Sequence, residues 1–351
     1  MRQNNFFLML LKVFFFSSIL VATSAVRAEL KVVTTIKPLH SLIANVMDGV
    51  GEPALIIEGS TSPHSFTLKP SHAKLLEEAD IIFWVGESIE TFMERPLESI
   101  VKNAEVVEFM EVESINKLKF REESIFEDHD DHDDHDDHDD HDDHDDNDDH
   151  DDHDDHDDHD DHNDHDDHDD HDDHSGHDHH AHAHGEFDAH IWLDPMNAKE
   201  MVHEIAHELG DLDPANKNKY EANAQATIQA LDQLVNDIEK GINKDAKFVV
   251  LHDAYQYFEE RFGLRAAGAL TLNTDVLPGA KQIADIQDVI KDRGIKCIFS
   301  EPQFNPKIIT TIAEDMNIKT GVFDPLGANI DSNKDLYFKL IQNLGNELKG
   351  C

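Results

Sequence analysis

A run of aspartate and histidine in the middle of the chain limits the fold more than any other feature. Between Asp128 and His184 the 351-residue sequence holds 31 Asp and 20 of its 27 His, mostly as repeated Asp-Asp-His triplets, with no Glu, Lys or Arg. A period of three fits neither a helix nor a strand. The tract has almost no apolar side chains, so it cannot bury enough surface to offset its ordering entropy. It predicts a disordered insertion, residues 128–184, between two segments that can fold.

The composition of this tract also predicts a chemistry. Neutral imidazole binds Zn²⁺, Cu²⁺ and Ni²⁺ well, and carboxylates add charge and oxygen donors. A flexible chain must be ordered each time an ion binds, so we expect several weak sites there. One interpretation is an auxiliary collector, sensor or chaperone for metal ions. The other is a solvated acidic linker that binds metal incidentally, and the sequence leaves both open.

The charge of the chain comes mostly from the tract. Its Asp residues supply 31 of the 47 net negative charges, which leaves −16 for the rest of the chain. An acidic balance of this size argues against binding to nucleic acid or to anionic membrane surfaces, and it favours small cations.

The N-terminus predicts export. Residues 1–28 have Arg2 near the start, an apolar middle and small residues before Ala28, which is typical of a cleaved signal peptide. No cysteine follows the expected cleavage site to carry a lipid, so we expect a soluble protein of the periplasm. The two cysteines, Cys297 and Cys351, would meet an oxidising compartment there, and we predict that they form one disulfide.

Outside the tract, apolar strand patterns alternate with helix patterns. This order predicts an α/β fold with parallel sheets flanked by helices. From Pro214 to Ile242, apolar residues recur at three- and four-residue spacing, which predicts one long amphipathic helix that Asp213 can cap. The expected division is an N-terminal lobe, the insertion, a linker helix and a C-terminal lobe, at residues 29–127 with 185–212, 128–184, 213–243 and 244–351.

Four polar residues lie in loops or at strand ends in this pattern. His64 lies in a loop after an apolar strand, His190 lies in "DAHIWLDP", and His252 directly follows "FVVL". Asp324 follows the apolar segment "TGVF" in the same way. In open α/β sheets binding residues gather at the carboxyl ends of strands. Each position is weak evidence alone, because a lone histidine at a strand end is more often structural, but three such histidines spread over both halves are a better signal of a binding site.

The ordered motifs "SPHSFTLKPS", "HIWLDP", "FVVLHDAYQYF", "EPQF" and "DPLG" resemble the metal-binding receptors of bacterial ABC importers. The closest resemblance is to the periplasmic zinc receptors. It covers nearly all of the chain after the signal peptide, including both cysteines. A His- and Asp-rich insertion between the first two metal histidines is also typical of that family.

The resemblance implies two lobes bridged by one long helix, with a metal ion in the cleft between them. Carried over by position, the ligands are His64, His190 and His252, and Asp324 would coordinate the ion or orient a ligand. Some zinc receptors have a Glu before the first histidine, where this chain has Pro63, so the fourth ligand stays open. Three imidazoles suit Zn²⁺ better than Mn²⁺.

The implied function is that of a non-enzymatic receptor that carries Zn²⁺ to the membrane permease of an ABC importer. We expect a monomer that could also accept zinc from other periplasmic donor proteins. The first alternative is a metal store or buffer that acts mainly through the tract. A surface adhesin is another, which the missing lipid-anchor cysteine disfavours.

A third alternative is a secreted zinc protease, because "HEIAH" at 203–207 matches the His-Glu-x-x-His signature of such enzymes. His203 and His207 would then bind the metal and Glu204 would be the general base. The third ligand would fall at Asp213, which we expect to cap the next helix. We therefore interpret the motif as an outer helix face, where the two histidines could bind metal incidentally.

Overall fold

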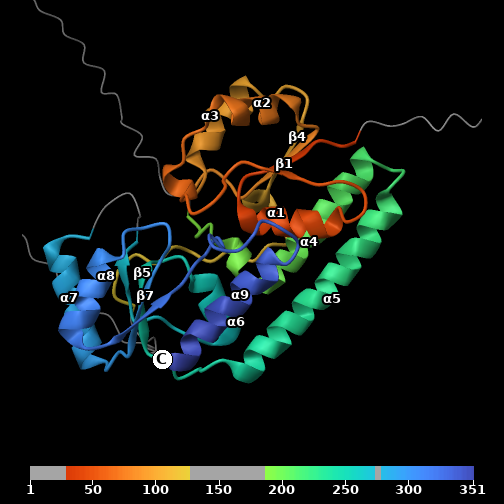
Figure 1. The fold of residues 1–351 in the computed structure, drawn as a ribbon. Helices are drawn as coiled ribbons and strands as arrows, with labels where there is room; N and C mark the ends of the chain where they lie inside the picture. The colour runs from red at the N-terminus through yellow and green to blue at the C-terminus, as the bar shows by residue number, and fades with distance from the viewer. Residues whose placement is uncertain (1–28, 127–185, 273–277) are drawn as a thin grey trace, which may run out of the picture.

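The computed structural model describes residues 29–126, 186–272 and 278–351, which form two α/β lobes (Figure 1). The predicted signal peptide and aspartate-histidine tract lie outside the described residues. The first lobe has a four-stranded sheet in the order β2-β1-β3-β4, in which all neighbouring strands are parallel. Its strands are β1 (Val32–Thr34), β2 (Ala54–Leu55), β3 (Ile81–Trp84) and β4 (Glu105–Glu108).

The second lobe repeats this architecture. Its sheet has the order β6-β5-β7-β8 and is also parallel throughout. The central strands are apolar and fully buried, as expected where helices cover both faces of a parallel sheet. The strands of this lobe are β5 (Phe248–His252), β6 (Ala269–Thr271), β7 (Cys297–Ser300) and β8 (Lys319–Val322).

Helices connect and cover the strands of each lobe, so the predicted fold class is confirmed. In the N-terminal lobe they are α1 (Lys37–Val46), α2 (Pro70–Glu78), α3 (Glu94–Ser99) and α4 (Pro195–Leu212). In the C-terminal lobe they are α6 (Gln256–Phe262), α7 (Ala280–Asp292), α8 (Lys307–Met316) and α9 (Leu336–Glu347). Short 3₁₀ turns cover Pro63–Ser65, Thr91–Met93, Phe109–Glu111, Ile191–Leu193 and Leu348–Gly350.

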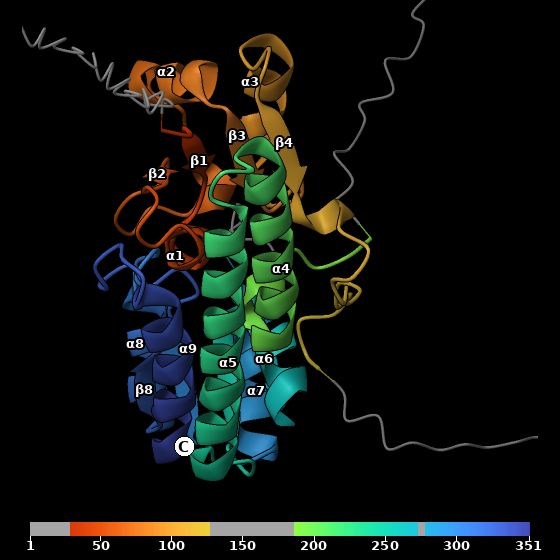
Figure 2. The same ribbon diagram turned by 90° about the vertical axis from the view of Figure 1, so that its right-hand side faces the viewer.

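One long helix, α5 (Lys217–Gly241), runs along both lobes beside α4 (Figure 2). Its 25 residues give a length of about 37 Å at the α-helical rise, and it packs against α1, α4 and α9. The expected cap at Asp213 is wrong. Helix α4 continues to Leu212, Asp213 ends it by donating its backbone N–H to Leu209, and α5 begins only at Lys217.

Besides the connection through α5, the chain also reaches from the N-terminal lobe to the C-terminal lobe just before the tract begins. The amide of Asp188 donates to the carbonyl of Leu118 at 2.8 Å. Further on, the amide of Ala269 donates to the carbonyl of Ser124 at 2.8 Å, at the β6 edge of the second sheet. We call residues 118–126 the crossing segment. It ties the chain that leads into the tract to the C-terminal lobe.

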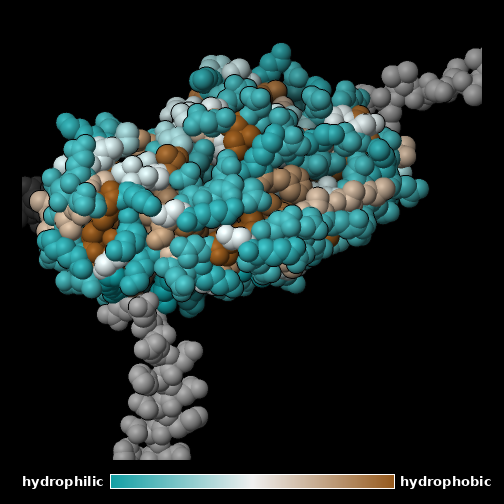
Figure 3. All heavy atoms as spheres, turned by 60° about the horizontal axis from the view of Figure 1, so that its bottom comes forward, coloured by the Kyte–Doolittle hydropathy of each residue, from teal (hydrophilic) through white to brown (hydrophobic). Residues whose placement is uncertain are grey.

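The predicted disulfide is present and joins Cys297, at the start of β7, to Cys351. It attaches the end of the chain to the C-terminal sheet. The described part of the chain contains no helix that is long and apolar enough to cross a membrane. Its surface is mostly hydrophilic in the view of Figure 3. Among the described residues, the exposed large hydrophobic side chains are Val106 and Val322.

Candidate metal centre

Three histidines from separate elements lie at the junction of the two lobes. His64 is in the 3₁₀ turn Pro63–Ser65, which begins where the Ser62 hydroxyl accepts the His64 amide at 3.3 Å. His190 directly precedes the turn Ile191–Leu193 in the N-terminal lobe. His252 is the last residue of β5 in the C-terminal lobe, at the carboxyl edge of the sheet where ligands bind in open α/β folds.

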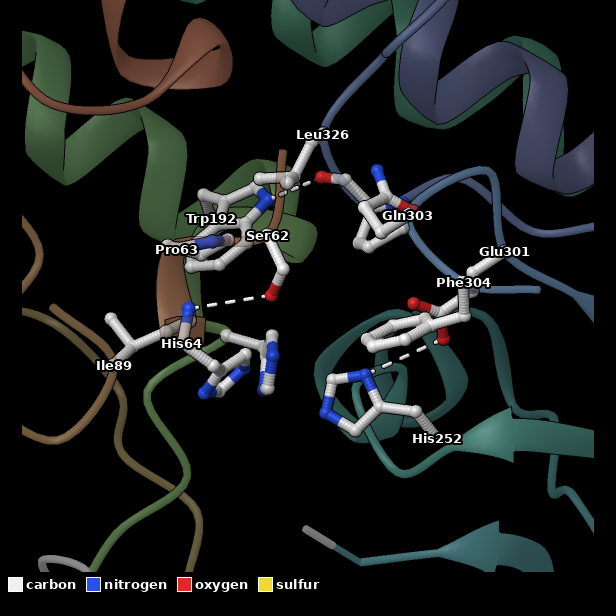
Figure 4. A pocket seen from close by; sticks show the side chains of 12 residues that line it. Ser62, Pro63, His64, Ile89, Trp192, His252, Glu301, Gln303, Phe304 and Leu326 are labelled. Atoms are coloured by element: carbon white, nitrogen blue, oxygen red, sulfur yellow. Dashed lines mark hydrogen bonds and ion pairs between the residues drawn. The ribbon is translucent and has the colours of Figure 1, made fainter. Parts of the chain in front are cut away.

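The three histidines lie close together, and Figure 4 shows the side chains of His64 and His252 beside the same cavity. One ring nitrogen from each of His64, His190 and His252 lies within 4.8 Å of the others. The centroids of the rings are 4.9 to 5.6 Å apart. Nitrogens that each lie about 2.0–2.1 Å from a shared zinc ion are at most about 4.2 Å apart, which is within the limit of 4.8 Å. The arrangement therefore suits a single ion.

The space between the rings is small. The volume of the cavity is about 10 Å³. That is room for about one water molecule, and so for one ion but not for an organic ligand. Trp192, Phe304 and Leu326 close it on the apolar side, and Glu301 and Gln303 are its polar neighbours.

A buried carboxylate orients His190. Its Nδ1 lies 2.7 Å from Oδ1 of Asp188, which also accepts the His190 amide at 3.0 Å. Because Nδ1 is engaged, Nε2 is the nitrogen that can face a metal. Burial raises the pKa of Asp188 to about 7. Burial also lowers the pKa of His190 well below its usual value, so this ring stays neutral and able to bind a cation.

A second carboxylate lies behind His252. Oε1 of Glu301 lies 3.4 Å from Nδ1 of His252, and both side chains are buried. Burial lowers the pKa of His252, but Glu301, together with the charges of Asp253 and Asp188, outweighs it and leaves that pKa raised. Glu301 directly follows β7, the strand that pairs with β5, so the sheet itself brings the two residues together.

Asp324, the fourth predicted site residue, has a different environment. Its Oδ1 accepts the amides of Leu326 and Gly327, and its Oδ2 accepts the amide of Ala328 at 2.6 Å. Oδ1 also accepts Nε2 of Gln303 at 3.0 Å, and Gln303 lines the cavity. The structure thus brings the three histidines together, and in it Asp324 contacts the site through Gln303.

Sequence reasoning missed Asp188 and Glu301. Asp188 stands two residues before His190 in "DAHIW", close enough in sequence to reach the same ring. Glu301 ends an apolar strand in "IFSEPQF", as His252 ends its own strand. The rule about strand ends that predicted His252 could therefore have found Glu301 as well.

The protease-like motif lies on an exposed face of α4. His203 and His207 are both exposed, and Nδ1 of His207 contacts Glu208 of the same helix at 3.1 Å. Among the residues that the structure describes, the single group of three or more potential metal ligands is His64, His190 and His252.

Comparison with known proteins agrees with this geometry. Residues 32–351 match the family described as zinc-uptake complex component A, periplasmic (ZnuA). The chain belongs to this family. It is 48% identical over 322 residues to the high-affinity zinc uptake system protein ZnuA of Brucella abortus (strain 2308), covering 91% of both chains. It is 37% identical to the protein of the same name from Haemophilus influenzae, covering 92% of this chain and 93% of the other.

Solved structures agree with the fold. A crystal structure of ZnuA superposes with a TM-score of 0.65 at 19% identity, covering 91% of this chain and 98% of the other. A zinc-bound ZnuA lacking residues 138–173 of its own sequence gives a TM-score of 0.63 at 20% identity, covering 91% and 98%. The family resemblance inferred from the motifs is therefore confirmed. The ZnuA family comprises periplasmic components of zinc uptake, and the curated relatives are named as parts of an uptake system.

Proposed function

We propose that this protein is an exported receptor that binds one Zn²⁺ through His64, His190 and His252 and delivers it to the permease of an ABC importer. One observation supports this most strongly. Three imidazoles from two lobes lie within 4.8 Å of one another, in a chain of the zinc-uptake family. Neutral imidazole is a preferred Zn²⁺ ligand, and a site held by two lobes can form and release by a small lobe movement.

Asp324 has a supporting role in this proposal. Its carboxylate holds the loop at 326–328 and positions Gln303 beside the ion. The fourth coordination position then falls to water or to a carboxylate that moves on binding. The receptor acts as a monomer whose lobes are residues 29–127 with 185–212 and residues 244–351. A signal peptide at 1–28 directs it to the periplasm, where it can accept zinc from donor proteins.

The aspartate-histidine tract, residues 128–184, serves as an auxiliary low-affinity collector. Its composition supports this role. The positions of its flanks support this role as well. The crossing segment leads into the tract, and residues 186–188 connect the end of the tract to His190.

Zinc titration of three proteins tests the proposal. We expect the mature chain to bind one Zn²⁺ tightly and several weakly, and a variant lacking 128–184 to keep only the tight site. A variant with His64→Ala and His252→Ala should keep only the weak sites. If deletion of the tract removes the tight site, the tract is the primary binder and the store or buffer is the better description.

A further inference from the structure

The three histidine ligands carry no negative charge that could balance the charge of a bound Zn²⁺ ion. Three neutral imidazoles add no charge, yet Zn²⁺ brings two positive charges into a buried cavity. A buried ion without opposing charge is costly, because the low dielectric inside a protein replaces little of its hydration energy. Apart from any carboxylate that becomes the fourth ligand, negative charge can come from residues behind the histidines.

Each lobe places one carboxylate behind one of the two fully buried histidines. Asp188 of the N-terminal lobe lies 2.7 Å from His190, and Glu301 of the C-terminal lobe lies 3.4 Å from His252. Both carboxylate side chains are at least 98% buried. Among the described residues, neither forms an ion pair with a lysine or arginine. Oδ2 of Asp188 accepts no hydrogen bond there, and Oε1 of Glu301, the atom that faces His252, is too far from that ring for a hydrogen bond.

Two other buried carboxylates lie nearby but have a cation of their own. Arg121, in the crossing segment, contacts Asp253 at 2.9 Å and Glu259 at 2.7 Å. These side chains are therefore partly neutralised by a guanidinium. The charge of Arg121 also reaches Asp188, where it opposes the effect of burial on the pKa, but the ionic contacts that Asp188 and Glu301 make within 4 Å are with the imidazoles that face the cavity.

We propose, building on the function above, that Asp188 and Glu301 are positioning residues that make the site prefer divalent over monovalent cations. Imidazole binds both Zn²⁺ and copper ions, so the three rings alone discriminate weakly. The attraction between a fixed carboxylate and an ion scales with the charge of the ion. Removing one carboxylate should therefore cost Zn²⁺ about twice as much binding free energy as Cu⁺.

The test compares the dissociation constants of Zn²⁺ and Cu⁺ for the full mature chain. Chromophoric chelators compete for less than one equivalent of metal, without oxygen, so that the tightest site is measured. Loss of a carboxylate behind a ligating histidine typically weakens metal binding 10- to 100-fold. We expect Glu301→Gln to weaken Zn²⁺ by about 30-fold and Cu⁺ by about fivefold. The ratio of the Zn²⁺ to the Cu⁺ dissociation constant therefore rises, and Asp188→Asn should raise this ratio as well.

Two further variants separate charge from structure. Glu301→Asp keeps the charge and should restore most of the Zn²⁺/Cu⁺ ratio even if the contact lengthens. Glu90→Gln is the matched control, because Glu90 is a buried carboxylate that accepts the amides of Val85 and Gly86 instead of contacting an imidazole. It should shift the ratio by less than about threefold.

The possible results have distinct meanings. Equal losses for both ions in Glu301→Gln and Asp188→Asn, or no loss, would overturn the charge role. Failure of the wild-type chain to bind Zn²⁺ tightly would instead overturn the proposed function. Thermal unfolding of each variant without metal shows whether it is folded. Since Asp188 also accepts a backbone amide, Glu301→Gln decides the matter if Asp188→Asn is unstable.

Discussion

The cavity histidines and the histidines of α4 show how differently the same side chain can be placed. His64, His190 and His252 come from three elements of two lobes, and His190 and His252 are buried against carboxylates. His203 and His207 come from one helix and face solvent. The helical pair has the more familiar sequence motif, yet the scattered set has the convergent geometry.

The difference shows what a metal motif needs besides spacing. Four-residue spacing places two side chains on one face of a helix, but it says nothing about what that face contacts. In α4 the opposite face carries the buried residues Met201, Val202 and Ile205, so the histidines are on the outside. A binding site also needs a third ligand from elsewhere and partners that fix the rings.

The largest expected effect comes from removing a cavity ligand. His252→Ala should weaken zinc binding at the tight site by at least about 100-fold, more than loss of an outer-shell partner does. His207→Ala, which removes the same group from an exposed position, is the matched control and should change the dissociation constant less than about twofold. Chelator competition measures both. Equal effects in the two variants would remove the distinction between the two regions.

The next effect concerns the ion pairs that support the cavity. Arg121 pairs with two buried carboxylates, so Arg121→Met leaves them without a cation and should lower the free energy of unfolding by about 3 kcal/mol. The control is Lys281→Met, which breaks the exposed Lys281–Asp285 pair and should change the free energy of unfolding far less, because solvent screens that pair. Urea denaturation without metal measures both. Similar losses would mean that the crossing segment does not stabilise the site.

Much of the fold could be predicted from the sequence because its patterns are local. Buried strands such as "FVVL" and the periodic apolar face of α5 depend on residues close together in the chain. The start of α5 could not be predicted in this way. Aspartate is a residue type that often caps helices, but the Asp213 carboxylate accepts hydrogen bonds from the side chains of Asn216 and Tyr220 instead. Those contacts depend on how α4 packs against α5.

The site was predictable where it followed the strand-end rule and unpredictable where it depended on loop conformation. His252 ends a strand, and the family motifs contain His64 and His190. The environment of Asp324 follows from the turn at 326–328, whose amides surround the carboxylate. The strand-end rule applies equally to Glu301 and Asp324, so it does not indicate which of these two carboxylates lines the cavity.

Acidification should weaken zinc binding, because a histidine ligand of the cavity becomes protonated. The pKa of His252 is raised above 6.5, so this ring is mostly protonated at pH 5.5, and the proton competes with the metal. His190 stays neutral because its pKa is lowered. Zinc affinity should therefore fall by at least about tenfold between pH 7.5 and 5.5. Isothermal titration at the two pH values measures it, and equal affinities would show that no ligand titrates in this range.

The smallest effect is expected at the protease-like motif, and its absence is informative. In a zinc protease Glu204 would activate a metal-bound water, and Glu204→Ala would abolish cleavage. Here the motif faces solvent, and among the described residues no convergent group of three potential metal ligands includes His203 or His207. We expect no zinc-dependent cleavage of casein by the wild type or by Glu204→Ala. His203→Ala with His207→Ala should leave the tight dissociation constant within about twofold. Cleavage lost in Glu204→Ala would instead show that α4 holds a catalytic ion, and burial would then be a poor guide to function in this chain.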